Sequence, residues 1–437
     1  MVQIKLRERN AITQSLLAGV VPKVGLQHIQ VGRRDEINAI ITDLDRIIDG
    51  GATIRFIIGR YGSGKSFFLN LSRLVALEKK FVVVQADITP DRRLHATGGQ
   101  AKALYTELMH SMATRAKPEG RGLPSVIERW ISDLDHRLRQ EGKGDEEVIR
   151  AIHHELRPLQ DFVSGYDFAS VLGRYYEGFQ RGDDALTASA LRWLSGEYET
   201  KGEARDDLGV RTIIKDQNIY DYLKLWAAFV RMAGYAGLIV SLDEMGVLSH
   251  RLNSTQARNA NYEMILRIVN DCLQGSVSGI GFIFAGTDEF LADSRKGIAS
   301  YEALASRLRE NEFAVNGLVD MSGPVIKLNN LTAEDLFVLF CNIRNVFAKG
   351  DPSQYLLPDY GLTQFMGYCS NVLGAEFYQT PRDAVKKFVG LLSVLEQNPG
   401  TKWEALLSGP SSKIHIDESK NEETSDRNDN DLVTFRL

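Results

Sequence analysis

The chain has 437 residues, of which 43% are hydrophobic and 25% are charged, as in an ordinary soluble globular protein. This length exceeds that of most single domains, so we expect one core with accessory regions. A formal net charge of −5 argues against whole-chain attraction to nucleic acid and leaves only a local basic face open. The 3 cysteines form no C-x-x-C pair, which argues against disulfides and zinc and favours a reducing, cytoplasmic location. No apolar run approaches the roughly 18 residues that a membrane span needs, so we expect no membrane partner.

The N-terminal segment, residues 1–26, carries basic residues ahead of an apolar stretch. Polar residues interrupt that stretch at 13–15 and no convincing cleavage site follows, so the pattern favours an amphipathic helix over a secretion signal. Residues 27–100 then read as an α/β unit, in which apolar runs at 54–58 and 81–87 are typical of buried parallel strands. We therefore expect an α/β fold with a parallel sheet at its core.

A phosphate-binding loop of the form G-x-x-x-x-G-K-[ST] occupies residues 59–66, directly after the first of these strands. In such loops the backbone N–H groups surround the β-phosphate, and the following helix aims its N-terminus at the phosphates. Lys65 is expected to reach the β- and γ-phosphate oxygens, and the Ser66 hydroxyl to bind Mg²⁺. We therefore expect ATP with Mg²⁺, held by Gly59, Arg60, Tyr61, Gly62, Ser63, Gly64, Lys65, Ser66 and Phe67.

An insertion interrupts the α/β pattern at residues 101–215. Charged residues are frequent there, β-branched runs are few, and apolar residues recur at helical spacing, so a large helical insertion is predicted. Short apolar runs return at 237–243 and 280–287, which places the rest of the core within residues 216–330. The nucleotide-binding core is therefore predicted to be discontinuous in sequence.

An Asp-Glu pair, Asp243 and Glu244, ends the first of these later runs. This is the Walker B pattern, in which the aspartate orients the Mg²⁺ hydration shell and the glutamate polarises the attacking water. The pair therefore favours attack by water over transfer of a phosphoryl group to a substrate hydroxyl. The alternative is a buried strand that happens to end in two acids.

A helical C-terminal lid is predicted at residues 331–407, where helical spacing returns. Thr332 and Asp335 have the spacing of a capping box at the start of its first helix. Over residues 408–437 the apolar pattern is lost and acidic residues are frequent, which indicates an acidic, disordered tail.

Five motifs in the same order resemble those of AAA+ P-loop ATPases of the Orc/Cdc6-like branch. They are the box at 31–36, the phosphate loop, the Asp-Glu strand end, and the segments at 285–288 and 380–383. More narrowly, the loop with its two following phenylalanines, the long insertion and residues 301–308 resemble BrxD-type ATP-binding proteins of BREX-related phage-defence systems. In the Orc/Cdc6-like branch a box similar to 31–36 surrounds adenine and ribose, which implies contacts from Val31, Gly32 and Arg33.

The AAA+ resemblance also implies further catalytic residues. Thr287, at the end of a core strand, is similar to the polar residue that contacts the γ-phosphate or the attacking water. Arg382 resembles the sensor-2 arginine, a lid residue that touches the γ-phosphate. Arg307, with Arg309 as the alternative, is the candidate that acts in trans on a neighbour's nucleotide, which implies a homo-oligomer. Ordinary structural roles remain the alternative for each of these residues.

The BrxD-type resemblance implies a cytoplasmic ATPase that acts with a helicase-like or other defence-system protein against foreign DNA. Direct DNA binding is left open, because no clear winged-helix module follows the lid. The leading hypothesis is that ATP hydrolysis drives assembly or remodelling of a DNA-associated defence complex. A nucleotide-gated scaffold that hydrolyses ATP negligibly is the alternative. A small-molecule kinase is a third, which the Walker B glutamate and the size of the lid disfavour.

Overall fold

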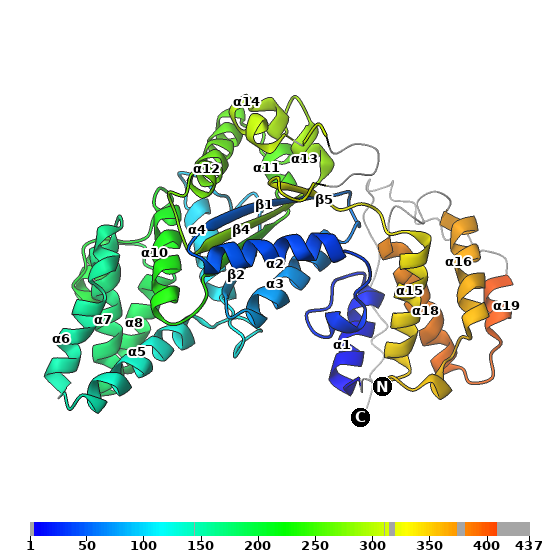
Figure 1. The fold of residues 1–437 in the computed structure, drawn as a ribbon, viewed down its shortest axis with the longest axis horizontal. Helices are drawn as coiled ribbons and strands as arrows, with labels where there is room; N and C mark the ends of the chain where they lie inside the picture. Colours follow the sequence, from blue (N-terminus) through cyan, green and yellow to red (C-terminus); the bar gives the residue numbers. More distant parts are fainter. Residues whose placement is uncertain (1–3, 144, 310, 314–319, 374–380, 409–437) are drawn as a thin grey trace, which may run out of the picture.

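A computed structural model of the chain describes residues 4–143, 145–309, 311–313, 320–373 and 381–408 (Figure 1). In this described part, a sheet of five parallel strands forms the centre. The strands are β1 (Ala52–Ile58), β2 (Val82–Asp87), β3 (Leu238–Asp243), β4 (Ile280–Gly286) and β5 (Val325–Lys327). They lie in the order β2-β3-β4-β1-β5, so the late strands β3 and β4 separate β1 from β2. The predicted parallel α/β fold is confirmed.

Helices cover both faces of the sheet, and every residue of β1, β3 and β4 is buried as a result. One face packs against two helices, and Ile40 and Leu69 from these helices share an apolar cluster with Ile57 of β1. The opposite face packs against three others. The first pair is α2 (Arg34–Ile48) and α3 (Lys65–Glu78), and the second set is α4 (Gln100–Ser111), α10 (Ile219–Met232) and α12 (Thr255–Leu273).

The insertion forms a helical lobe at one end of the molecule, at the left of Figure 1. The Trp130 ring centroid in this lobe lies 5.5 Å from that of Phe229 in α10. The Phe168 centroid lies 5.2 Å from that of Trp226, also in α10. One apolar core therefore runs from the sheet into the lobe. After α4, the lobe contains α5 (Leu123–Gln140), α6 (Asp145–Glu155), α7 (Gly165–Arg181), α8 (Asp184–Leu194) and α9 (Lys201–Leu208).

The lid is helical as well, and the N-terminal helix packs on it. Arg9 of that helix donates to the Phe347 carbonyl at 2.9 Å, and its guanidinium lies 5.2 Å from the Phe347 ring centroid. The predicted capping box is confirmed, since Thr332 and Asp335 exchange two hydrogen bonds of 3.1 Å. Of the predicted tail, all but Ser408 lies outside the described residues. The helices here are α1 (Leu6–Ala18), α15 (Ala333–Phe347), α16 (Asp359–Leu373), α18 (Pro381–Gln397) and α19 (Trp403–Ser408).

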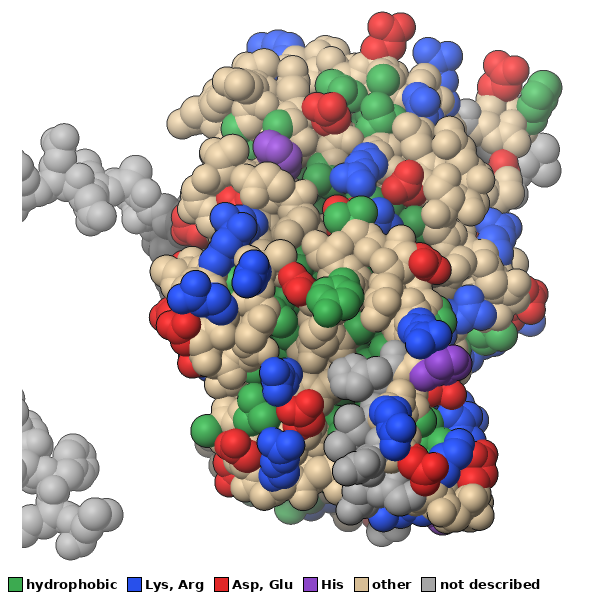
Figure 2. Space-filling model, turned by 90° about the vertical axis from the view of Figure 1, so that its left-hand side faces the viewer, with side chains coloured by type: hydrophobic (Ala, Val, Ile, Leu, Met, Phe, Trp, Pro, Cys, Tyr) green, Lys and Arg blue, Asp and Glu red, His purple; other side chains and the backbone are tan. Residues whose placement is uncertain are grey.

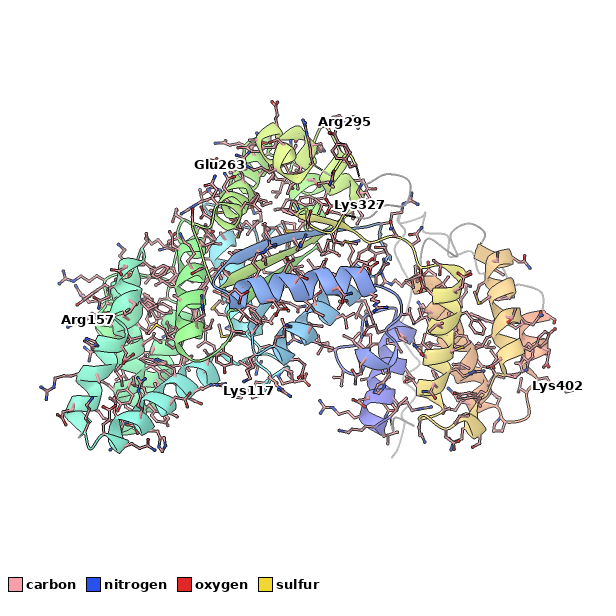
Figure 3. All side chains as sticks on the ribbon, in the orientation of Figure 1. Lys117, Arg157, Glu263, Arg295, Lys327 and Lys402 are labelled. Atoms are coloured by element: carbon pink, nitrogen blue, oxygen red, sulfur yellow. The ribbon has the colours of Figure 1, made fainter. Side chains whose placement is uncertain are left out.

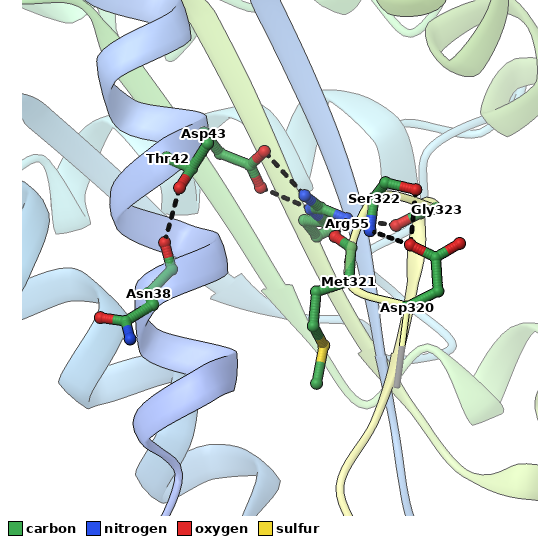
Figure 4. A network of polar contacts seen from close by, with 8 residues as sticks. All are labelled: Asn38, Thr42, Asp43, Arg55, Asp320, Met321, Ser322 and Gly323. Atoms are coloured by element: carbon green, nitrogen blue, oxygen red, sulfur yellow. Dashed lines mark hydrogen bonds and ion pairs between the residues drawn. The ribbon is translucent and has the colours of Figure 1, made fainter. Parts of the chain in front are cut away.

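A buried ion pair ties α2 to the centre of the sheet (Figure 4). Arg55 of β1 donates through Nη2 to Asp43 Oδ1 at 2.8 Å and through Nη1 to the Met321 carbonyl at 2.9 Å. It also donates to the Gly323 carbonyl. The exposed fractions of Asp43 and Arg55 are 4% and 5%, so neither charge is solvated. The pair joins a helix, a central strand and the segment that leads into β5.

Replacing Asp43 with asparagine is expected to lower the free energy of unfolding by about 3 kcal/mol, because it leaves the Arg55 charge buried without its counterion. Urea unfolding followed by circular dichroism measures the change. Asp45→Asn is the matched control on the same helix, since Asp45 pairs with Lys79 at a solvent-accessible site. The control is expected to change stability by less than about 1 kcal/mol. If both variants lose the same free energy of unfolding, the buried ion pair stabilises the fold no more than the exposed one.

Candidate active site

The phosphate loop joins the end of β1 to the start of α3 and is shaped by its glycines. Gly64 precedes α3 with φ 93°, a left-handed conformation that favours glycine. At Gly59, a Cβ atom would lie 2.6 Å from the Ser63 hydroxyl oxygen. That hydroxyl is buried and has no hydrogen-bond partner in the described part of the chain. A buried hydroxyl without a partner, beside the N–H groups that begin a helix, fits a phosphate oxygen.

Lys65 begins α3, and its side chain folds back over the loop. Its Nζ donates to the carbonyl oxygens of Gly59 at 2.9 Å and Arg60 at 2.8 Å. Burial lowers the pKa of the Lys65 ammonium group, and the carboxylates of Asp243 and Glu244 oppose that shift. Neutral carbonyls thus hold the cation at the loop, and phosphate oxygens would be stronger partners for it.

The phosphate loop and the Walker B strand meet at Ser66 and Asp243, which are 177 residues apart in sequence. The Ser66 hydroxyl donates to Asp243 Oδ2 at 2.6 Å, and Asp243 is buried. A hydroxyl and a carboxylate side by side are the hard oxygen ligands that Mg²⁺ prefers. Within the described ranges no group of three or more His, Cys, Asp or Glu could hold a metal alone. The donor set therefore fits Mg²⁺, which proteins usually bind through few side chains together with substrate phosphates.

Glu244 follows β3 with φ 59°, a backbone conformation uncommon for residues other than glycine. Its N–H donates to Asp243 Oδ1 at 2.8 Å, and its side chain lines the same cavity as Lys65. Burial raises the pKa of Glu244, Asp243 raises it further, and Lys65 lowers it. Strained backbone of this kind persists where the surrounding structure holds it, commonly at active sites.

A cavity of about 450 Å³ lies between the phosphate loop and the lid, which is within the usual size range for a small-molecule site. Its polar end contains Lys65, Ser66 and Glu244. Apolar side chains of the N-terminal segment, of the stretch that follows it up to Val31, and of the lid line the rest, as a purine base requires. These side chains are Leu16, Val20, Val21, Pro22, Ile29, Val31, Leu331, Leu339, Ile343, Pro381 and Val385.

Most residues that are predicted to contact the nucleotide lie in the cavity wall, and the others lie beside it. All of them line the cavity except Gly32, Gly59 and Arg60. A Cβ atom on Gly32 would lie 3.4 Å from an Asp335 carboxylate oxygen of the lid. Arg33 lines the cavity but pairs with Glu36 at 3.2 Å. It also donates to the Asn329 carbonyl at 2.5 Å, which connects α2 to the segment entering the lid.

The two predicted catalytic arginines lie in different places. Arg382, near the start of α18, lines the cavity and donates through Nη1 to the Tyr61 hydroxyl at 2.8 Å. Arg307 lies outside the cavity, is exposed, and donates through Nε to Asn270 Oδ1 at 2.5 Å. Arg309 is exposed as well. Of the predicted segment at 380–383, residue 380 lies outside the described residues.

Thr287 lies directly after β4, the strand beside β1. The Gly59 N–H donates to the Gly286 carbonyl at 3.2 Å, so the residue before Thr287 contacts the phosphate loop. The Thr287 hydroxyl accepts the Phe290 N–H at 3.4 Å and caps the short helix α13 (Asp288–Ala292). Thr287 itself is not a lining residue of the cavity. Its position next to the loop is compatible with the predicted role, which stays a prediction.

Sequence reasoning missed two parts of the site. The first is the N-terminal segment that lines the cavity from Leu16 to Pro22, for which no motif exists. The second is Asp87, which ends β2 and pairs in register with Asp243 of β3. Burial and the Asp243 carboxylate raise the pKa of Asp87. An acid at the end of an apolar run was the signal that could have identified it.

A phosphate loop follows β1, and an Asp-Glu pair ends β3, a parallel strand of the same sheet that β4 separates from β1. Together with a helical lid over the cavity, these features define a P-loop nucleotide-binding protein. Residues 4–410 match the family model described as BREX system ATP-binding protein BrxC/D. The chain therefore belongs to the BrxC/BrxD family of ATP-binding BREX proteins, and the predicted resemblance to BrxD-type proteins is confirmed.

The chain is also similar to solved structures. The Aeropyrum pernix ORC2 protein, solved in ADPNP-ADP complexes, is similar at 14% sequence identity with a TM-score of 0.31. The similarity covers 82% of this chain and 67% of that chain. No curated protein matches. None of the helices in the described ranges is long and apolar enough to cross a membrane.

Proposed function

We propose that this protein hydrolyses ATP and uses the nucleotide cycle to assemble or remodel a DNA-associated anti-phage defence complex with a helicase-like partner. The observation that carries the enzymatic part is the contact between Ser66 and Asp243 at 2.6 Å, with Glu244 and Lys65 lining the same cavity. The defence role and the partner rest on membership of the BREX family.

The proposed chemistry assigns one task to each side chain. Lys65 exchanges the carbonyls of Gly59 and Arg60 for β- and γ-phosphate oxygens. Ser66 and Asp243 would hold Mg²⁺, which would supply positive charge against the charge that develops on the phosphate. Glu244 orients the attacking water and accepts its proton. Thr287 is proposed to position that water.

Positive charge at the γ-phosphate is proposed to come from two arginines. Arg382 reaches the cavity from the lid of the same chain, and no described carboxylate pairs with it. Its charge is therefore available for an anion. Arg307 is exposed and outside the cavity, so it is proposed to serve a neighbouring subunit's nucleotide in a homo-oligomer.

Contacts with DNA and with the partner are proposed to need an assembled complex. The end of the molecule formed by the insertion shows basic and acidic side chains intermixed rather than one basic patch (Figure 2). Such a surface favours protein contacts over the phosphate backbone, which requires clustered positive charge. We therefore assign partner recognition to the insertion and any DNA contact to the assembled complex.

Phosphate release and mass photometry test this function together. ATP is expected to produce steady phosphate release and larger assemblies, and double-stranded DNA is expected to stimulate release only when a partner or an assembly is present. Tight ATP binding without phosphate release, with or without DNA and the other proteins of the system, would instead indicate a nucleotide-gated scaffold. Phosphate transfer to any acceptor but water would indicate a kinase.

A further inference from the structure

Tyr61 is an aromatic residue in the third position of the phosphate loop, and its exposed fraction is 68%. Binding phosphate through backbone N–H groups does not require a side chain at this position. A large ring left in solvent gains little from burial. The contacts of the ring are therefore expected to explain why a tyrosine occupies this position.

The Tyr61 side chain contacts Arg382 of the lid in two ways. The Arg382 Nη1 donates to the Tyr61 hydroxyl at 2.8 Å, and the guanidinium carbon lies 5.6 Å from the centroid of the Tyr61 ring. Across the described residues Arg382 has no other hydrogen bond and no ion pair. The contact spans 321 residues of sequence and joins the phosphate loop directly to the first turn of α18.

The N-terminal segment restricts the same guanidinium from another side. Gly19 ends α1 with φ 72°, and a Cβ atom there would lie 3.1 Å from Arg382 Nε. A side chain at this position would press on the arginine and would also strain the backbone. Arg382 is exposed and lies close to both the phosphate loop and the C-terminal end of α1.

We propose that Tyr61 is the positioning residue for Arg382: it holds the lid guanidinium over the phosphate loop so that its remaining N–H groups can meet a γ-phosphate. This inference rests on the proposed ATPase function and deepens it. A phenol is a neutral acceptor, so it orients the guanidinium without neutralising its charge, as a carboxylate would. A guanidinium has five N–H donors, and within the described part of the chain Arg382 uses only one of them.

The contact is weak enough to adjust during a nucleotide cycle. A cation over an aromatic ring at an exposed site contributes little, and so does a solvent-exposed hydrogen bond from a guanidinium to a neutral hydroxyl. The lid can therefore open to exchange nucleotide, and the arginine returns to the loop when the lid closes.

Kinetics of two Tyr61 variants test the proposal. Tyr61→Phe removes only the hydroxyl and is expected to lower kcat about 3-fold, while Tyr61→Ala removes the ring as well and is expected to lower kcat about 10-fold. KM for ATP is expected to change less than about 2-fold, because Lys65 and the loop backbone still bind the phosphates. In an Arg382→Ala background, neither Tyr61 substitution is expected to lower kcat further.

Tyr166→Phe is the matched control, since Tyr166 has an exposed fraction of 69% and lies in the insertion lobe. It is expected to leave kcat unchanged. If wild-type protein hydrolyses ATP and the Tyr61 variants keep the wild-type kcat, the positioning role is overturned while the ATPase function stands. If the Tyr61 substitutions lower kcat equally in the presence and absence of Arg382, the positioning role is also overturned, because their effect then does not act through the arginine.

Hydrogen exchange of the nucleotide-free protein tests the contact without any hydrolysis. Tyr61→Ala and Arg382→Ala are each expected to speed exchange in the first two turns of α18, and the double variant no more than either. Unchanged exchange in both single variants would overturn the proposal. If wild-type protein shows no ATP turnover but the exchange results are as expected, the proposed function fails and the contact between loop and lid stands.

Discussion

Replacing Glu244 with glutamine is expected to lower the rate of ATP hydrolysis by about 10³-fold and to leave ATP binding within about 3-fold of the wild-type affinity. Glutamine keeps the size and shape of the side chain but cannot accept the proton of the attacking water. Because the Glu244 N–H, and not its carboxylate, bonds to Asp243, the substitution leaves that backbone contact in place.

Single-turnover phosphate release measures the chemical step, and calorimetric titration measures ATP affinity. Glu263→Gln is the matched control, because Glu263 is an exposed glutamate on α12 (Figure 3) and does not line the cavity. It is expected to behave as the wild type. Clear hydrolysis by Glu244→Gln at the wild-type rate would remove Glu244 from the mechanism, whereas negligible hydrolysis by both proteins would favour the scaffold.

Replacing Lys65 with alanine is expected to weaken ATP binding by about 10³-fold. The ammonium group can donate to two phosphate oxygens, and charged hydrogen bonds contribute about 1.5–3 kcal/mol each, so about 4 kcal/mol is lost. In the nucleotide-free protein the substitution removes only hydrogen bonds to the carbonyls of Gly59 and Arg60. Folding stability should therefore change far less than affinity.

Calorimetric titration with ATP and with ADP checks this expectation, and thermal unfolding verifies that the variant is folded. Lys402→Ala removes an exposed lysine at the outer end of the lid (Figure 3) and is expected to bind ATP normally. An affinity of Lys65→Ala within 10-fold of the wild type would show that the triphosphate does not lie in this loop. The two variants together separate binding, which needs Lys65, from chemistry, which needs Glu244.

The sequence determined the local elements of the fold and the chemistry of the phosphate end of the site. Buried parallel strands need apolar residues on both faces, so β1, β3 and β4 appear as mainly apolar runs, which only a few polar residues such as Arg55 and Ser241 interrupt. The loop at residues 59–66 must follow a strand and precede a helix, so one short pattern predicts three consecutive elements. The capping box at Thr332 is equally local, because its hydrogen bonds lie within three residues.

Only the tertiary structure decided which distant segments complete the site. Strand order depends on packing across the sheet, and it is this order that brings Asp243 within 2.6 Å of Ser66. The apolar part of the cavity combines the segment after α1 with lid helices, and its residues share no sequence period because they come from separate elements. The contact between Tyr61 and Arg382 spans 321 residues, so no local pattern could predict it. Side chains that meet only when the lid packs on the core produce no local sequence pattern, because their contact depends on shape and charge complementarity in three dimensions.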